Sequence, residues 1–336
     1  MHDTALIGLG LIASKYSSDK AMLKSLNFFT HAQVLDKHQN YNWISGVDPS
    51  EKARNDAEKS WGARELVSSV RKLKNRERYE VIVLATPPES RLEIIKDFPS
   101  LKAVIVEKPL GNSYNSSALF LEECEKRGIQ VQVNLTRRAD LKMRSFFNGE
   151  LNKKIGSTQF VFGTYGRGLY NYGTHLIDLI RMLIGEISSV TCLSSHKDQD
   201  LGPIKNDLNL SFLMKTHEGV QIVMHPLNHS FYREGSLDIW GEKGRIEIFQ
   251  EGLKYAESPL NECRSLEGAF EISTDKRITK DTGYSDALFN LYSNLSSAMI
   301  GDTKLYSSGK SALRSESIID SLFLSFREGG KEIPCS

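Results

Sequence analysis

Short apolar runs that end in turn residues recur through the first third of the chain. Each run closes in glycine, proline or a charged residue. The four runs are 4–13, 43–48, 80–88 and 103–111. Runs of this kind are typical of strands buried on both faces of a parallel sheet. Polar, helix-like segments at about 49–59 and 65–74 separate them, so the pattern predicts an α/β domain with a doubly wound sheet.

The second half of the chain has a different pattern, dominated by alternating segments. We expect strands of a half-exposed antiparallel sheet near 188–194, 208–215, 220–225, 236–240 and 245–249. Closing helices are expected at about 284–299 and 310–326. The segment 170–185 is apolar around most of a helix, and only His175, Asp178 and Arg181 interrupt it, at spacings of three. A solvated edge and a catalytic edge fit this stripe equally well.

The first apolar run enters a glycine turn that fits G-x-G-x-x-[GA] through Gly8, Gly10 and Ala13. In a dinucleotide-binding fold the first glycine makes the tight turn, the second admits a pyrophosphate, and the third small residue lets a helix approach the sheet. Residues 14–27 delay the next helix-like segment to about 29–38. We interpret them as an insertion beside the phosphates, although an extended first helix fits the periodicity equally well.

Charged residues stand at the ends of two predicted strands. A carboxylate in the position of Asp48 accepts hydrogen bonds from ribose hydroxyls and repels the extra phosphate of NADP, so Asp48 favours NAD. The alternative is an aspartate that starts a turn before Pro49. Glu107 and Lys108 close the run at 103–106, where they either cap the sheet or face a cofactor.

Composition excludes several classes of function. The 43 basic and 42 acidic side chains give no field of one sign, so we expect neither a nucleic-acid nor a membrane partner. The four cysteines have no metal-ligand spacing, and no metal site is expected. No apolar run approaches a membrane span and no signal sequence is seen. We therefore expect reduced thiols in a cytoplasmic protein.

Several of these motifs together resemble the glucose-fructose oxidoreductase, inositol dehydrogenase and MocA (Gfo/Idh/MocA) family, over essentially the whole chain. They are the glycine turn, Asp48, Ala85-Thr-Pro-Pro88, Val106-Glu-Lys-Pro109, Asn134 with Arg137-Arg138, Asn171-Tyr-Gly-Thr-His175-Leu-Ile-Asp178 and Asp238–Glu247. The resemblance implies an α/β protein with an NAD(P)-binding Rossmann domain over 1–133. A substrate-binding and oligomerisation domain with an open, mostly antiparallel sheet would occupy 134–336. The active site would lie between them, and the Lys108–Pro109 peptide would be cis.

The same resemblance implies roles for individual residues. Catalytic roles fall on Lys108, His175 and Asn171. Cofactor binding falls on Gly8, Gly10, Leu11, Ile12, Asp48, Thr86, Pro87, Pro88, Glu107, Lys108 and Asn134. Substrate binding falls on Arg138, Tyr165, Arg167, Tyr170, Asn171 and His175. In the oxidation of an alcohol, an imidazole would take the proton and the Lys108 ammonium would stabilise the negative charge on the oxygen.

One residue near the implied catalytic histidine differs from the family pattern. Many members have an aspartate four residues before the histidine, where this chain has Asn171. Asparagine forms hydrogen bonds but carries no charge, so we expect His175 to titrate lower than in relatives with the aspartate.

The expected function is hydride transfer between NAD, with NADP as the alternative, and a hydroxyl or keto group of a sugar, polyol or nucleotide sugar. Redox-assisted glycoside cleavage with retained NAD is a variant. The competing class is a non-catalytic NAD(P)-binding sensor, suggested by Asn171 and by the insertion. A homodimer or homotetramer formed through the second domain's sheet is implied by the resemblance.

Overall fold

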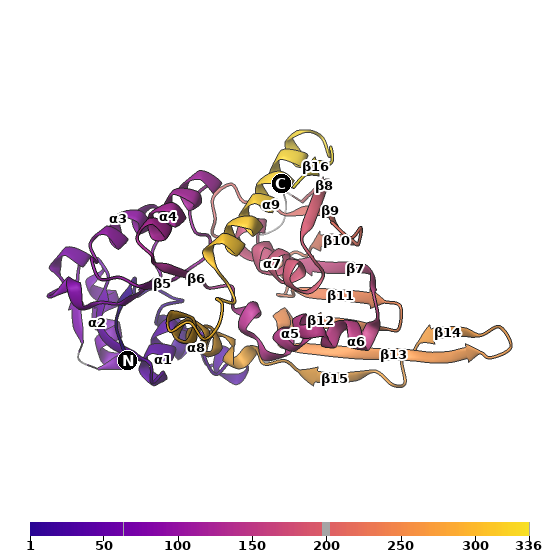
Figure 1. Ribbon diagram of the computed structural model, residues 1–336, viewed down its shortest axis with the longest axis horizontal. Helices are drawn as coiled ribbons and strands as arrows, with labels where there is room; N and C mark the ends of the chain where they lie inside the picture. The colour runs from indigo at the N-terminus through magenta and orange to yellow at the C-terminus, as the bar shows by residue number, and fades with distance from the viewer. Residues whose placement is uncertain (63, 197–201, 336) are drawn as a thin grey trace. The chain divides into compact units, whose positions relative to one another are not determined.

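The computed structural model describes residues 1–62, 64–196 and 202–335, and the chain divides into two compact units (Figure 1). The first comprises Met1–Ala139 with Tyr284–Leu313, and the second Asp140–Gly283 with Arg314–Ser336. The boundary expected at 133/134 makes the domains consecutive, whereas residues 284–313 return to the first unit. They do so because α8 (Ala287–Met299) buries Leu291, Tyr292 and Leu295 in a core shared with Tyr41.

A six-stranded parallel sheet in the order β3-β2-β1-β4-β5-β6 forms the centre of the first unit. Its strands are β1 (His2–Ile7), β2 (Tyr41–Val47), β3 (Glu65–Val67), β4 (Val81–Leu84), β5 (Ala103–Val106) and β6 (Gln130–Val133). Alternate residues of β4 enter opposite cores, Ile82 in one and Val83 in the other. Both faces are therefore buried, which explains the uninterrupted apolar runs and confirms the Rossmann architecture.

Helices cover both faces of this sheet. The α-helices are α1 (His31–Lys37), α2 (Glu51–Trp61), α3 (Arg91–Lys96), α4 (Tyr114–Lys126) and α8. The shorter helices are η1 (Lys15–Ser18), η2 (Met22–Lys24), η3 (Val70–Lys72), η4 (Arg76–Arg78), η5 (Pro88–Ser90), η6 (Thr136–Ala139) and η10 (Tyr284–Asp286). The helix expected at 65–74 is wrong, because Glu65–Val67 pairs with β2 instead.

Residues 14–27 form an insertion rather than an extended first helix. They contain η1 and η2, and α1 begins only after Thr30, which forms a capping box with Gln33. The amide of Ala32 donates to the Ala13 carbonyl at 2.8 Å. The helix thus packs directly on the glycine turn, and the small side chain of Ala13 permits that approach.

A ten-stranded sheet organises the second unit, in the order β14-β13-β12-β11-β7-β10-β9-β8-β16, with β15 paired to β13. Its strands are β7 (Thr158–Tyr165), β8 (Ile187–Ser195), β9 (Leu210–Thr216), β10 (Gln221–Pro226), β11 (Ser236–Gly241), β12 (Gly244–Phe249), β13 (Lys254–Arg264), β14 (Ala269–Ile272), β15 (Ile278–Asp281) and β16 (Ile333–Pro334). Among these pairings only β7 with β10 is parallel in the described residues. The mostly antiparallel sheet is therefore confirmed.

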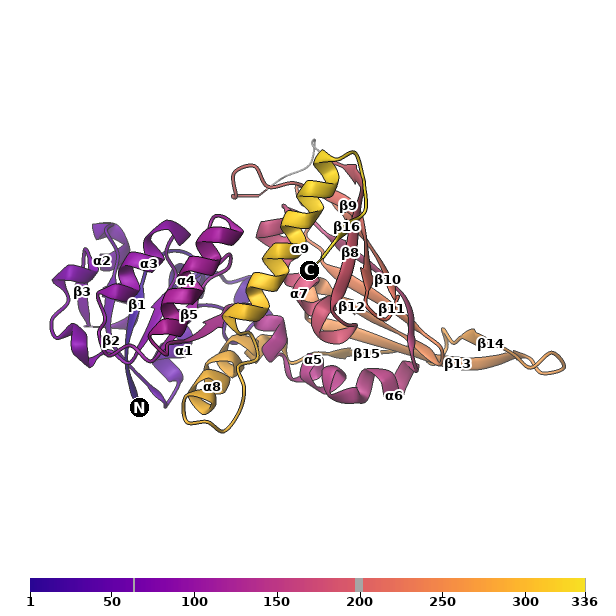
Figure 2. The ribbon, with the colours of Figure 1, turned by 45° about the horizontal axis from the view of Figure 1, so that its top comes forward.

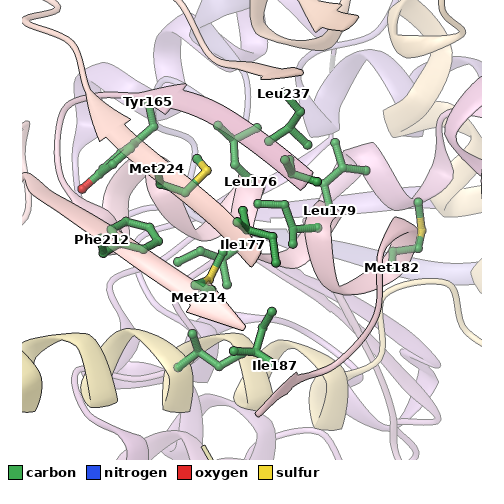
Figure 3. Packing of buried hydrophobic residues seen from close by; sticks show 14 of the residues in the cluster. Tyr165, Leu176, Ile177, Leu179, Met182, Ile187, Phe212, Met214, Met224 and Leu237 are labelled. Atoms are coloured by element: carbon green, nitrogen blue, oxygen red, sulfur yellow. The ribbon is translucent and has the colours of Figure 1, made fainter. Parts of the chain in front are cut away.

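One face of this sheet carries α5, α6 and α7 (Figure 2). The helices of the unit are α5 (Leu141–Ser145), η7 (Phe146–Glu150), α6 (Leu151–Ile155), η8 (Leu169–Gly173), α7 (Thr174–Leu183), η9 (Gln250–Gly252) and most of α9 (Gly309–Arg327). Figure 3 shows Leu176, Ile177 and Leu179 of α7 packed among Met224 and Leu237 of the sheet. This apolar contact fixes α7, which carries His175 in its first turn.

Candidate active site

The glycine turn of the first unit has the geometry of a phosphate cradle. Gly8 has a φ of +91°, and a Cβ there would lie 2.4 Å from the Ala85 carbonyl oxygen, so only glycine fits. A Cβ on Gly10 would meet no atom within 4 Å. Within the described chain no hydrogen bond forms from the amides of Gly10, Leu11 and Ile12. Consecutive free amides beside a glycine suit an anion such as a pyrophosphate.

Asp48 follows β2 and supports the same turn. Its Oδ2 accepts a hydrogen bond from the Leu9 amide at 2.8 Å, and its Oδ1 accepts one from the Ser50 amide at 2.8 Å. A carboxylate offers about four acceptor positions, so this one can stabilise the local turn and still accept from ribose hydroxyls. Both interpretations offered by the sequence are compatible with this geometry.

The carboxyl ends of three adjacent strands bring together the other expected cofactor residues. Thr86 follows β4, Glu107 and Lys108 follow β5, and Asn134 follows β6. The Lys108–Pro109 peptide is cis, as expected. This end of a doubly wound sheet is where such folds bind ligands.

Arg91 joins the turns after β4 and β5, a role that sequence reasoning missed. The residue is 2% exposed. Nη2 donates to the Thr86 carbonyl at 2.8 Å, and Nη1 donates to the carbonyls of Glu107 at 2.7 Å and Leu110 at 3.1 Å, and to that of Pro109. One buried side chain thus fixes the backbone at Thr86 and on both sides of Lys108.

A buried hydrogen-bond chain holds the Glu107 carboxylate. His31 Nε2 lies 3.0 Å from Glu107 Oε1, and the Asn134 amide nitrogen donates to the same oxygen. Burial alone would raise the pKa of Glu107, but the hydrogen bonds from His31 and Asn134 and the charges of His31 and Lys108 outweigh it and lower that pKa. Sequence reasoning missed His31, although the capping box at Thr30 could have placed it in the first turn of a helix.

Two buried polar atoms at these strand ends have no hydrogen-bond partner among the described residues. They are Asn134 Oδ1 and Thr86 Oγ1. Buried polar atoms without partners are rare in folded proteins and call for a ligand or an ordered water. Together with the open backbone at Gly10, they make the first unit fit a nicotinamide dinucleotide.

Asn171 and His175 lie in the second unit: Asn171 is on η8, the turn that leads into α7, and His175 is in the first turn of α7. Asp207 fixes this turn: its carboxylate accepts from the amide of Tyr170 at 3.1 Å and from that of Asn171 at 2.9 Å. Burial raises the pKa of Asp207. Sequence reasoning missed this carboxylate, because it follows no periodic pattern and acts only on the backbone of a distant segment.

The expected substrate residues have different environments. Tyr165 is fully buried in the core, where its hydroxyl donates to the Leu210 carbonyl at 2.7 Å and accepts from the Leu210 amide at 2.8 Å, so its assignment to the substrate is wrong. The hydroxyl of Tyr170 donates to Asp320. Arg167, at a φ of 58°, is partly exposed between β7 and η8. Arg138 is partly exposed on η6 of the first unit.

The stripe on α7 is not a solvated edge. Asp178 is 1% exposed and Arg181 is 6% exposed. Arg181 donates to Glu186 through Nε and Nη2, and to the Ser315 hydroxyl at 2.8 Å. These two charges therefore join α7 to its neighbours, and His175 is the partly exposed member of the stripe.

All four cysteines are free thiols. Among residues 1–62, 64–196 and 202–335, no three His, Cys, Asp or Glu side chains gather where a metal ion could bind. No helix in the described part of the chain combines the length and the hydropathy needed to cross a membrane.

Two family models match the sequence. Residues 3–135 match an oxidoreductase family with an NAD-binding Rossmann fold, and residues 143–247 match the GFO/IDH/MocA C-terminal domain. No curated protein matches the chain.

Solved structures resemble the chain over nearly its whole length. The WlbA dehydrogenase from Bordetella pertussis, solved with NADH and UDP-GlcNAcA, is 18% identical, with a TM-score of 0.73 over 99% of this chain and 98% of its own. A putative myo-inositol dehydrogenase from Sinorhizobium meliloti 1021 is 17% identical, with a TM-score of 0.74 over 100% of both chains. A levoglucosan dehydrogenase, solved with NADH and levoglucosan, is 17% identical, with a TM-score of 0.75 over 99% of both. At these identities the likeness is one of fold.

Proposed function

The chain belongs to the Gfo/Idh/MocA family of oxidoreductases, with an NAD-binding Rossmann domain, and we propose that it transfers a hydride between NAD(H) and a hydroxyl or keto carbon of a sugar, polyol or nucleotide sugar. The observation that carries this proposal is the group of polar atoms after β4, β5 and β6. Lys108 stands there with Thr86 and Asn134, whose buried Oγ1 and Oδ1 have no partner within the described chain.

In the proposed cofactor site, the amides of Gly10, Leu11 and Ile12 hold the pyrophosphate. Asp48 accepts hydrogen bonds from the ribose hydroxyls, and its negative charge repels the extra phosphate of NADP. Thr86, Pro87, Pro88 and Asn134 lie along the nicotinamide end. Arg91 keeps the backbone of that end in place through its hydrogen bonds to the Thr86 and Glu107 carbonyls. The Glu107 carboxylate orients the side chain of Asn134, which donates to it.

The proposed reaction uses two side chains of this protein. When bound, NAD⁺ accepts the hydride. His175 takes the hydroxyl proton on its imidazole and returns it in the reductive direction. The Lys108 ammonium stabilises the negative charge that grows on the substrate oxygen. We assign Asn171 a hydrogen-bonding role that adds no charge.

Relatives of similar fold support the substrate class. Two of them were solved with UDP-GlcNAcA and with levoglucosan, and a third is a putative myo-inositol dehydrogenase; all three compounds carry secondary hydroxyl groups. Arg138 and Arg167 are cations that could bind a carboxylate or phosphate on such a substrate. We therefore place anionic and nucleotide-linked sugars first in the panel to be tested.

The test is NADH formation on a panel of polyols, sugars and nucleotide sugars, followed by His175→Asn and Lys108→Met. We expect stoichiometric NADH with at least one substrate. Each variant should lose about 10²- to 10⁴-fold in kcat, while His175→Asn leaves the Kd for NADH nearly unchanged. His217→Asn, at an exposed turn between β9 and β10, is the matched control and should keep full activity.

Other outcomes distinguish the alternatives. Cleavage of a glycoside without net NADH would identify the redox-assisted variant. Tight NADH binding without turnover on any substrate, with a ligand response that His175→Asn does not alter, would contradict the proposal and favour a sensor.

We also propose that the protein is a cytoplasmic homodimer or homotetramer. The free thiols support a reducing compartment. The face of the ten-stranded sheet opposite α7 supports self-association, because Phe162 and Trp240 are 39% and 37% exposed there.

A further inference from the structure

A hydrogen-bond chain in the first unit joins α8, α1 and the ends of β5 and β6. The Tyr292 hydroxyl lies 2.8 Å from His31 Nδ1, and His31 Nε2 lies 3.0 Å from Glu107 Oε1. The Asn134 amide nitrogen donates to the same carboxylate oxygen. His31 is 0% exposed. Burial and the hydrogen bonds at both ring nitrogens hold this imidazole in one orientation.

The chemistry of Glu107 decides which way the Asn134 amide points. An ionised carboxylate can only accept hydrogen bonds, so the amide nitrogen of Asn134 must face it and the amide oxygen must point away. That oxygen is buried, on a side chain 7% exposed, and no described residue donates to it. The site therefore presents one fixed acceptor in need of a donor.

A ligand that carries an N–H group suits this acceptor. Asn134 follows β6, next to the end of β5 where Lys108 stands. In a doubly wound sheet the nicotinamide end of a dinucleotide lies over these strand ends. The carboxamide of nicotinamide has two N–H donors, and one of them would satisfy Oδ1.

We propose that His31 is a positioning residue which, through Glu107, holds the Asn134 amide with its oxygen toward the carboxamide N–H of the nicotinamide. The inference rests on the proposed function, since it needs NAD(H) at these strand ends. His31 is suited to the task because its Nε2–H donates to the ionised Glu107 carboxylate while Nδ1 is hydrogen-bonded to the Tyr292 hydroxyl. Loss of the imidazole removes a hydrogen bond that stabilises the ionised form of Glu107. A protonated Glu107 carboxyl would donate to the Asn134 amide oxygen, and the Asn134 amide would then flip.

The experiment compares the Kd of NADH with that of reduced 3-acetylpyridine adenine dinucleotide, in which a methyl group replaces the amide nitrogen. The wild-type protein should bind NADH about tenfold more tightly, because the analogue leaves Oδ1 buried without a donor. His31→Leu should bring this ratio close to one. His31→Gln, whose amide can donate to Glu107, should restore most of it. Should His31→Leu not fold, Glu107→Gln breaks the same link, because its amide can donate to Asn134.

Two controls separate positioning from general damage. ADP-ribose lacks the nicotinamide and should bind every variant with the wild-type Kd. His38→Leu removes another buried imidazole, which follows α1 and bonds Ser293 of α8 at 2.9 Å, and should leave the NADH ratio unchanged.

The possible results are distinct. A wild-type protein that fails to bind NADH would reject the proposed function. A wild-type protein that binds NADH and the analogue equally would overturn the role of Asn134 and leave the function standing. An unchanged ratio in His31→Leu and Glu107→Gln, with normal ADP-ribose binding, would overturn the role of His31.

Discussion

At the scale of single residues, this chain differs from relatives that have an aspartate four residues before the histidine, because its Asn171 carries no charge. The Asp207 carboxylate, which contacts this turn, accepts hydrogen bonds from the backbone amides of Tyr170 and Asn171. Asn171→Asp would add a negative charge one helical turn before His175 and favour the imidazolium. We expect the acidic limb of the pH profile of kcat/KM to move to higher pH. An unmoved limb, in a variant that still binds NADH, would contradict this.

The Glu107 carboxylate should make stability depend on pH. Its pKa is lowered in the folded protein, so the unfolded chain binds the proton more readily. The ionised group therefore stabilises the fold above the ordinary carboxyl range, and this contribution is lost as the pH falls through the lowered pKa. Glu107→Gln should be less stable than the wild type by about 1–3 kcal/mol at pH 7. Thermal unfolding should show the gap closing as the pH falls below the ordinary carboxyl range; a gap of constant size would refute the role of the charge.

Single residues were predictable where a local pattern carries their role. Gly8, Gly10 and Ala13 are recognisable because their spacing matches backbone requirements of one turn. His31, Arg91 and Asp207 were missed, because each acts on atoms brought close only by the tertiary fold. Tyr165 was misassigned for the same reason: its neighbours in sequence form a glycine-rich segment, but β7 turns its ring into the core.

At the scale of elements, the turns after β4 and β5 depend on one buried guanidinium. Arg91→Met would leave the carbonyls of Thr86 and Glu107 without their donor and let both turns move. We expect a loss of about 1–3 kcal/mol in the free energy of unfolding together with a raised Kd for NADH, measured by denaturant titration and fluorescence.

Arg127 gives a matched control for this prediction. It also donates to two carbonyls, those of Ile95 at 2.7 Å and Phe98 at 2.6 Å, away from the strand ends after β4 and β5. Arg127→Met should lose comparable stability and keep the wild-type Kd. Equal effects of the two variants on NADH binding would show that Arg91 acts only on stability.

Elements with strong local patterns were predicted well, and edge elements were not. The buried runs of β4 and β5 and the apolar helix α7 follow from periodicity alone. Residues 65–74 have helical spacing, yet β3 forms there and pairs with β2, with Leu66 opposite Gly46. The glycine makes room for this strand, because a Cβ at position 46 would lie 2.9 Å from the Leu66 side chain. Pairing with a neighbouring strand thus overrides local propensity.

At the scale of the whole molecule, the first unit is built from two segments that lie far apart in the sequence. Residues 284–313 lie far along the sequence, yet Tyr292 of α8 bonds His31 and Tyr41 bonds the Tyr292 carbonyl at 2.8 Å. An amphipathic helix can bury its stripe against either unit, so periodicity could predict α8 without assigning it. A protein truncated before residue 284 would lack part of the dinucleotide-binding unit.

The second unit's sheet leads to a prediction about assembly. Phe162 of β7 and Trp240 of β11 lie on strands that pair directly, and both are exposed on the face opposite α7. Association would remove this apolar area from water. We expect light scattering to show a dimer or tetramer, and Phe162→Asp to shift it to monomer, because a charge buried at the interface is costly. Leu266→Asp, on the fully exposed tip between β13 and β14, should not. A monomeric wild-type protein, or equal behaviour of both variants, would reject this interface.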